Sequence, residues 1–202
     1  MATLAALLAD VYSLTNRSDL VAESTLAVKA ATLKAHQSDN FPRDKVFTNL
    51  ALGTATTATV LLSTLARWRS FNAIQRTNST GVPFDFGSDN DKGKFKILDS
   101  NNLFDDYSML QDNIAYIVGA SLYLRCAAGL GQVGLIWYQN PDLTNAADMG
   151  WISDSHPYCI VFEAARQIFK TIGYDEQAAV YKELIAEQFR MLRAANILAE
   201  GS

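Results

Sequence analysis

The sequence predicts an α+β fold, in which helices from both ends of the chain form a bundle and a strand-rich segment is inserted between them. Apolar residues recur at helical spacing near both termini. Between residues 44 and 144, short runs of β-branched and aromatic residues alternate with clusters of Gly, Asn and Asp. With 202 residues, a single domain is expected: residues 1–43 helical, residues 44–144 a strand-rich insertion and residues 155–199 a helical hairpin.

Two helices are predicted before the insertion. The first covers Thr3–Leu14, with apolar positions at Leu4, Leu7, Leu8, Val11 and Leu14. The second covers Asp19–His36, and Ser18 is its candidate N-cap. Its inner face is expected to hold Val21, Thr25, Val28, Thr32 and Leu33, with Lys29 and Lys34 pointing away. Pro42 ends the helical region, because proline does not continue a helix.

The middle of the chain is predicted to form short strands joined by turns. The expected strands are residues 46–52, 57–64, 69–77, 94–98, 114–118, 121–126 and 134–139. Residues 78–83 are predicted as a turn, 84–93 as a polar surface loop and 101–110 as a helical turn. Gly119 and Ala120 are typical of a two-residue hairpin turn, since glycine suits the first central position.

The last fifty residues predict two antiparallel helices. Ser155 is a candidate cap and Pro157 suits the first turn of the first helix. The expected inner face of this helix is Tyr158, Val161, Phe162, Ala165, Phe169 and Ile172. Gly173 is placed as a left-handed C-cap, and Asp175 as the cap of a final helix of about 24 residues, or about 36 Å. The stripe expected on that helix is Ala178, Tyr181, Leu184, Ile185, Gln188, Phe189, Leu192 and Ala195.

Composition argues against several classes of protein. The net charge is −4, and the densest basic segments are only Arg67–Arg69 and Lys92–Lys96. Sequence-specific DNA binding is therefore not expected, although a mildly acidic wall suits a passage through which DNA slides. Cys126 and Cys159 are expected as free buried thiols. Met1–Leu14 lacks the basic start of a signal peptide, and no segment is apolar for long enough to span a membrane, so a soluble protein is expected.

The motifs that could carry chemistry have simpler structural interpretations. Gly129–Gly134 matches the pattern GxGxxG, but a strand rather than a helix is predicted after it, so a turn between strands is expected. His36 and His156 have no metal-ligand or catalytic partner at suitable spacing. The acidic segments Asp105–Asp106 and Ser88–Gly93 are interpreted as solvated loops, because the second lacks the downstream glutamate of a calcium loop.

Two further groups have a structural interpretation. Glu163 is expected to pair with Arg166 or Lys170 along its helix. The aromatic residues Trp137, Tyr138, Trp151 and Tyr158 are expected in the core or in a subunit interface, although they would also suit a ligand pocket. No catalytic residue, cofactor site or metal site is predicted, and the chain is not expected to be an enzyme.

Several segments together resemble the head-to-tail adaptor proteins of short-tailed bacteriophages. In the N-terminal part these segments are Tyr12–Arg17 and Ala30–Arg43. In the middle they are Leu103–Tyr107 and Tyr138–Thr144. Near the end they are Pro157–Arg166 and Gly173–Ala179, and the last is the most characteristic, because a helix ending in Gly-x-Asp-Glu leads into a helix with an inward tyrosine.

The resemblance implies a structural virion protein that is made in the host cytoplasm and located at the head–tail interface. Such adaptors assemble as a homo-oligomeric ring, typically a dodecamer, under the portal protein. They bind the tail nozzle protein on the other side and line the channel used in DNA ejection, and double-stranded DNA passes without sequence-specific binding. By this analogy the final helix faces the portal, with Met191, Leu192, Ile197 and Leu198 as contact residues, unless they pack within the subunit.

Two other functions remain open at the level of sequence. One is another tail or neck completion protein of a phage, although a nozzle is expected to be larger and richer in strands. The other is a small-molecule-binding or enzymatic domain built on the strand-rich middle. That function would need a pocket with converging polar groups.

Overall fold

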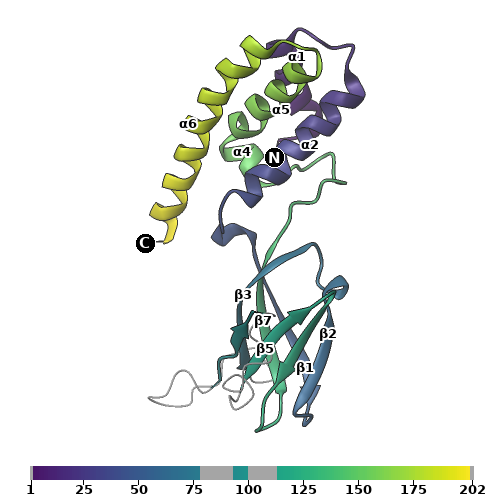
Figure 1. The fold of residues 1–202 in the computed structure, drawn as a ribbon, viewed down its shortest axis with the longest axis vertical. Coiled ribbons are helices and arrows are strands. Elements are labelled where there is room, and N and C mark those ends of the chain that lie inside the picture. Colours follow the sequence, from purple (N-terminus) through teal and green to yellow (C-terminus); the bar gives the residue numbers. More distant parts are fainter. Residues whose placement is uncertain (1, 78–92, 100–112, 201–202) are drawn as a thin grey trace. The chain divides into compact units, whose positions relative to one another are not determined.

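The computed structural model describes residues 2–77, 93–99 and 113–200, and side chains up to residue 197. The chain divides into two compact units with separate cores. The helical unit comprises Met1–Asp44 and Asn140–Ser202, and the strand unit comprises Lys45–Gln139. The fold is therefore α+β, with helices from both ends of the chain and a strand-rich middle, as the sequence predicts (Figure 1).

Helices α1 (Leu4–Thr15) and α2 (Val21–Gln37) open the helical unit. Thr3 caps α1 by accepting from the backbone N–H of Ala6, and Asn16 ends α1 in the left-handed conformation. Ser18 does not cap α2, which begins after Leu20 without a side-chain cap. The inner face of α2 also differs from the prediction, because Val21 is exposed. Val28 and Thr32 are buried as predicted, and Thr25 and Leu33 are half-buried. The other buried positions are Ser24, Ala27, Ala31, Ala35 and His36.

The C-terminal part of the helical unit contains α4 (Trp151–Ser155), α5 (Pro157–Thr171) and α6 (Asp175–Glu200). The sequence does not predict α4, and this short helix changes the role of Ser155: it ends α4 instead of capping α5, whose N-cap is His156. Gly173 has a φ of +81°, as predicted for a C-cap. Helix α5 packs against α1, α2 and α6 and forms the centre of the helical core (Figure 1).

The strands of the strand unit lie close to their predicted positions. They are β1 (Lys45–Gly53), β2 (Thr57–Leu61), β3 (Trp68–Thr77), β4 (Lys96–Leu98), β5 (Ile114–Val118), β6 (Ser121–Arg125) and β7 (Gly131–Gln139). Residues 62–64, predicted as strand, form a 3-10 turn. The predictions for residues 78–83 and 101–110, for nearly all of the loop 84–93, and for Asp105–Asp106 lie outside the described residues.

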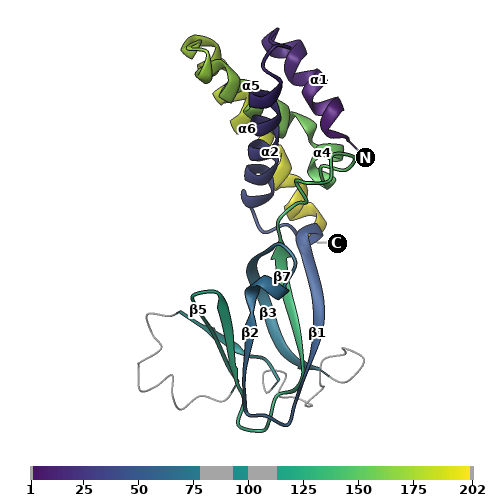
Figure 2. The ribbon, with the colours of Figure 1, turned by 90° about the vertical axis from the view of Figure 1, so that its right-hand side faces the viewer.

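Among the described residues the strands form two sheets, with orders β1-β7-β3 and β2-β6-β5-β4. Figure 2 shows β1, β7 and β3 side by side. Both sheets supply side chains to one apolar core, for example Leu122 and Leu124 from β6 and Val133 and Leu135 from β7. Strand β1 enters the unit and β7 leaves it, and the two pair antiparallel with Lys45 opposite Tyr138. Because the first and last strands are neighbours, a 95-residue stretch is inserted while the two parts of the helical unit, far apart in sequence, stay together in space.

Of the two turn predictions based on glycine, the one at Gly119 is confirmed, whereas the one over Gly129–Gly134 holds only for its first part, because β7 begins at Gly131. Gly119 has a φ of +60° in a two-residue turn that joins β5 to β6, with Val118 opposite Ser121. In the GxGxxG segment, Gly129 and Gly131 have positive φ, and Gly134 lies within β7. A Cβ on Gly134 would lie 2.8 Å from atoms of Phe47 and Thr77, so this glycine makes room for side chains of the neighbouring strands.

Candidate interaction surface on the C-terminal helix

Helix α6 contains 26 residues, which gives a length of about 39 Å. One side of it belongs to the core of the helical unit, through Ala178, Ile185, Phe189 and Leu192. Leu184 and Ala195, which the sequence analysis placed on the inner side, are exposed instead. The inner stripe is thus narrower than predicted, and apolar side chains remain on the solvent side of the helix.

The solvent side of α6 carries an outer stripe, defined as Val180, Leu184 and Met191. Val180 is 62% exposed and Met191 is 54% exposed. The spacings of four and seven residues place the three on one side of a helix with 3.6 residues per turn. With about 100° of rotation per residue, one edge of the stripe is lined by three exposed acidic residues, Glu176, Glu183 and Glu187. The outer stripe is therefore apolar with an acidic border.

The four residues predicted as portal contacts are placed differently. Met191 and Ile197 are exposed, and Ile197 is 69% exposed, more than any other large apolar side chain that the structure describes on α6. Leu192 is only 1% exposed and packs in the helical core, so it presents no surface to a partner. For Leu192, the alternative to portal contact, packing within the subunit, is therefore the one observed. The side chain of Leu198 lies outside the described residues.

A groove of about 490 Å³ lies between α2 and α6. Its apolar walls are Ala30 and Leu33 from α2 and Ile185 and Phe189 from α6. Two cations border it: Lys34, whose Nζ lies 6.0 Å from the centre of the Phe189 ring, and Arg193, which donates to the carbonyl of Ser38 at 3.3 Å. The groove therefore combines apolar walls with positively charged borders, whereas the border of the outer stripe is negatively charged.

Lys34 is held in place by Glu163, which is buried on α5. The Lys34 Nζ lies 3.0 Å from Glu163 Oε1, and Arg166 donates to the same oxygen at 2.7 Å. Burial alone would raise the pKa of Glu163, but the hydrogen bonds from Arg166, Lys34 and Gln167 outweigh it, so the pKa lies below its ordinary value. The predicted pair with Arg166 is confirmed, whereas Lys34, predicted to point away, is the partner that the sequence analysis missed.

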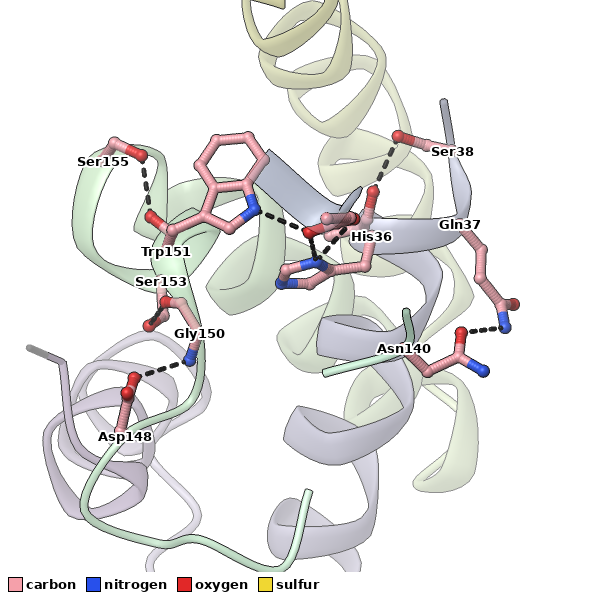
Figure 3. Close-up of polar contacts among 11 residues, drawn as sticks. His36, Gln37, Ser38, Asn140, Asp148, Gly150, Trp151, Ser153 and Ser155 are labelled. Carbon is pink, nitrogen blue, oxygen red and sulfur yellow. Dashed lines mark hydrogen bonds and ion pairs between the residues drawn. The ribbon is translucent and has the colours of Figure 1, made fainter. Parts of the chain in front are cut away.

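A second buried polar group links three segments of the helical unit (Figure 3). His36 donates from Nδ1 to the carboxylate of Asp44, with distances of 2.9 and 3.0 Å to its two oxygens. Trp151 donates from Nε1 to Asp44 Oδ1 at 2.8 Å. Asp44 is the last residue before β1, so this group fixes the point where the chain leaves the helical unit. Spacing in sequence does not reveal it, because Trp151 is 107 residues from Asp44.

The other sequence candidates have structural positions. His156 borders a cavity of about 130 Å³ together with Arg43, Trp151 and Asn196, and burial together with the nearby charge of Arg43 lowers its pKa. Both cysteines are free and buried, as predicted, and burial raises the pKa of Cys159 to about 11. Trp137 and Tyr138 belong to the strand unit, whereas Trp151 and Tyr158 belong to the helical unit.

Within residues 2–77, 93–99 and 113–200, no three His, Cys, Asp or Glu side chains gather in a way that could hold a metal ion. None of the helices in that same part of the chain is long and apolar enough to cross a membrane. Neither a scan against protein-family models nor a search of curated protein sequences found a match to the chain.

Proposed function

We propose that the chain is a structural virion protein of a short-tailed bacteriophage, a subunit of the adaptor ring between the portal and the tail nozzle. The observation that carries the proposal is the exposed apolar surface of α6, to which Val180, Leu184, Met191 and Ile197 contribute. Single exposed apolar residues are ordinary, but several on one long helix are typical of a protein that docks by a helix.

The division into two units supports the same function. Each unit has its own apolar core, so each can present a surface to a different partner without losing its fold. A connector between portal and nozzle needs two such surfaces. The net charge of −4 supports a channel role, since like charge lets DNA pass without adhering to the wall.

The portal contact is assigned to the C-terminal end of α6, at Met191 and Ile197. Leu192 is omitted because it is buried, and Leu198 remains a prediction from the sequence. Both retained residues are exposed, so their replacement leaves the core of the helical unit intact. The test is the affinity of portal rings for the wild-type chain and for a variant carrying Met191→Glu and Ile197→Glu, measured by biolayer interferometry.

The double variant is expected to bind the portal at least roughly tenfold more weakly, because two apolar anchors are replaced by charges that resist burial. Val118→Glu is the matched control, since Val118 is an exposed apolar residue of the strand unit. Unchanged portal binding by the double variant would refute the contact assignment. A wild-type chain that does not bind the portal would refute the adaptor function itself.

A further inference from the structure

We propose that neighbouring copies of this chain join by placing the N-terminal part of the outer stripe of α6, Val180 and Leu184, into the α2–α6 groove of the next copy. This inference rests on the proposed function, because it names the contact that would build the adaptor ring. The occupant of the groove is thus a second copy of the chain. The C-terminal end of α6, with Met191 and Ile197, stays available for the portal.

The groove suits an apolar helix edge with acidic neighbours. Its walls combine the small side chain of Ala30 with the larger Leu33, Ile185 and Phe189. These side chains leave an apolar groove with a volume of about 490 Å³ between the two helices. Lys34 and Arg193 place positive charge at its borders. Lys34 is held there by its ion pair with the buried Glu163, at 3.0 Å, so its position is fixed before any partner arrives.

The outer stripe supplies the complementary surface. Val180 and Leu184 are exposed one helical turn apart, and Glu183 and Glu187 are exposed beside them. In the complex, the apolar pair would fill the groove and the glutamates would meet Lys34 and Arg193. Opposite charges around an apolar contact favour this pairing and set its register. A stripe-to-stripe contact between two copies would instead bring acidic borders together and leave the groove empty.

The positions of the two surfaces on α6 determine the type of assembly. Phe189, in the groove wall, lies about 140° around the helix from Leu184, because each residue turns the helix by about 100°. The stripe and the groove therefore face different directions, so a copy can place its stripe in the groove of one neighbour while its own groove receives the stripe of another. Such a contact is heterologous, and repeated head-to-tail contacts close into a ring when the rotation between copies permits.

Two variants separate this contact from every other kind of self-association. The stripe variant carries Val180→Glu and Leu184→Glu, and the groove variant carries Ala30→Glu and Arg193→Glu. All four side chains are exposed, so both variants are expected to fold. The control carries Val21→Glu and Ala179→Glu, which are exposed positions of the same two helices outside the stripe and the groove lining. Circular dichroism verifies helix content in each variant.

Sedimentation velocity at increasing protein concentration gives the readout. The wild type and the control are expected to associate beyond the dimer, and each variant alone to stay monomeric. An equimolar mixture of the two variants is expected to stop at the dimer, because it contains one intact stripe and one intact groove for each pair. A monomeric wild type at every soluble concentration, or a groove variant that associates like the wild type, would overturn the inference.

The outcome is independent of the portal experiment. A chain that forms the mixed dimer but does not bind the portal keeps the stripe-in-groove contact and loses the adaptor function. A chain that binds the portal through Met191 and Ile197 but shows no head-to-tail association keeps the proposed function and loses this contact.

Discussion

The helical unit and the strand unit divide polar and apolar residues in different ways. The core of the strand unit is apolar, and the exposed large apolar residues in its described part lie on separate strands, at Phe47, Leu61, Ile97 and Val118. The helical unit buries His36, Asp44 and Glu163, while α6 leaves a stripe of apolar side chains in solvent. Among the described residues, the helical unit therefore gathers exposed apolar side chains along one helix, whereas the strand unit does not gather them on any one element.

The largest effect is expected from removing the shared acceptor of the buried polar group. Asp44→Ala deletes the carboxylate that accepts from His36, which is buried, and from Trp151, which is half-buried. The free energy of unfolding of the helical unit should fall by about 3 kcal/mol, since removing one member of a buried polar pair leaves the others poorly solvated. Denaturation followed by circular dichroism at 222 nm reports on the helices and measures this loss.

Amide hydrogen exchange shows whether the helical unit or the strand unit loses this stability. Asp44→Ala should speed exchange in α2 and α5, and Asp44→Asn, which keeps one carbonyl acceptor, should lose less stability. Faster exchange confined to β1 and β7 would mean that Asp44 supports the strand unit instead.

A smaller effect is expected at Glu163, the other buried anion of the helical unit. Glu163→Gln should lower the free energy of unfolding by about 1–2 kcal/mol at neutral pH, because the ion pairs with Arg166 and Lys34 become hydrogen bonds from cations to a neutral amide. The estimate is modest because half of the Lys34 side chain is exposed.

The pH dependence of this effect has a definite sign. Since folding lowers the pKa of Glu163, its contribution is present above the ordinary value of 4.5 and is lost as the pH falls through the lower value of the folded state. The difference in stability between wild type and Glu163→Gln should therefore shrink on acidification, in urea titrations at a series of pH values. A difference that grows towards acid pH would contradict the assignment of Glu163 as a buried anion.

In the strand unit, Gly134→Ala tests how tightly β7 is packed. The new Cβ would lie 2.8 Å from the Phe47 ring and from Thr77 Cγ2. Phe47 is half-exposed and has room to move, but Thr77 is buried and donates to Asn49 at 2.5 Å. We expect Gly134→Ala to lower the free energy of unfolding by about 1 kcal/mol. The crowding in the folded state outweighs the stabilisation that alanine gives by reducing the chain entropy of the unfolded state. Gly119→Ala at the exposed β5–β6 turn serves as the comparison, since its cost would come from its positive φ alone.

The smallest effect is expected in an experiment that changes no residue and measures how fast the two cysteine thiols react. Cys159 is buried in the helical core, and its pKa of about 11 keeps the reactive thiolate rare at neutral pH. Labelling with a thiol reagent should be slow in the native protein and should follow the opening of the helical unit. Cys126 reports in the same way on the strand unit, where it is also buried. Rapid labelling of either cysteine under native conditions would contradict its burial.

The strand unit was the more predictable from sequence, because its signals are local. Alternation in Ile114–Val118 and Ser121–Arg125, with glycine between them, determines both the strands and their register. Helix positions near the termini were also predictable, since apolar spacing and Gly173 define them. The buried faces of α2 and α6 were not predictable from sequence. Each helix has apolar residues on more than one side, and packing against α5 determines which of them are buried.

The candidate surface could be predicted only in part. Met191 and Ile197 follow from their place near the end of a long helix, but Leu192 differs from Met191 only by a turn of about 100° and is buried. A narrower inner stripe leaves Leu184 on the outer side of α6, four residues from Val180. The groove and the His36–Asp44–Trp151 group depend on residues far apart in sequence, and no local spacing predicts them.

The most direct test of the adaptor function is mass photometry of portal rings mixed with an excess of the purified chain. The account predicts one population, in which each portal ring has gained a fixed number of chains that matches the number of portal subunits. Portal rings whose mass does not change, or that bind a variable and small number of chains, would contradict it.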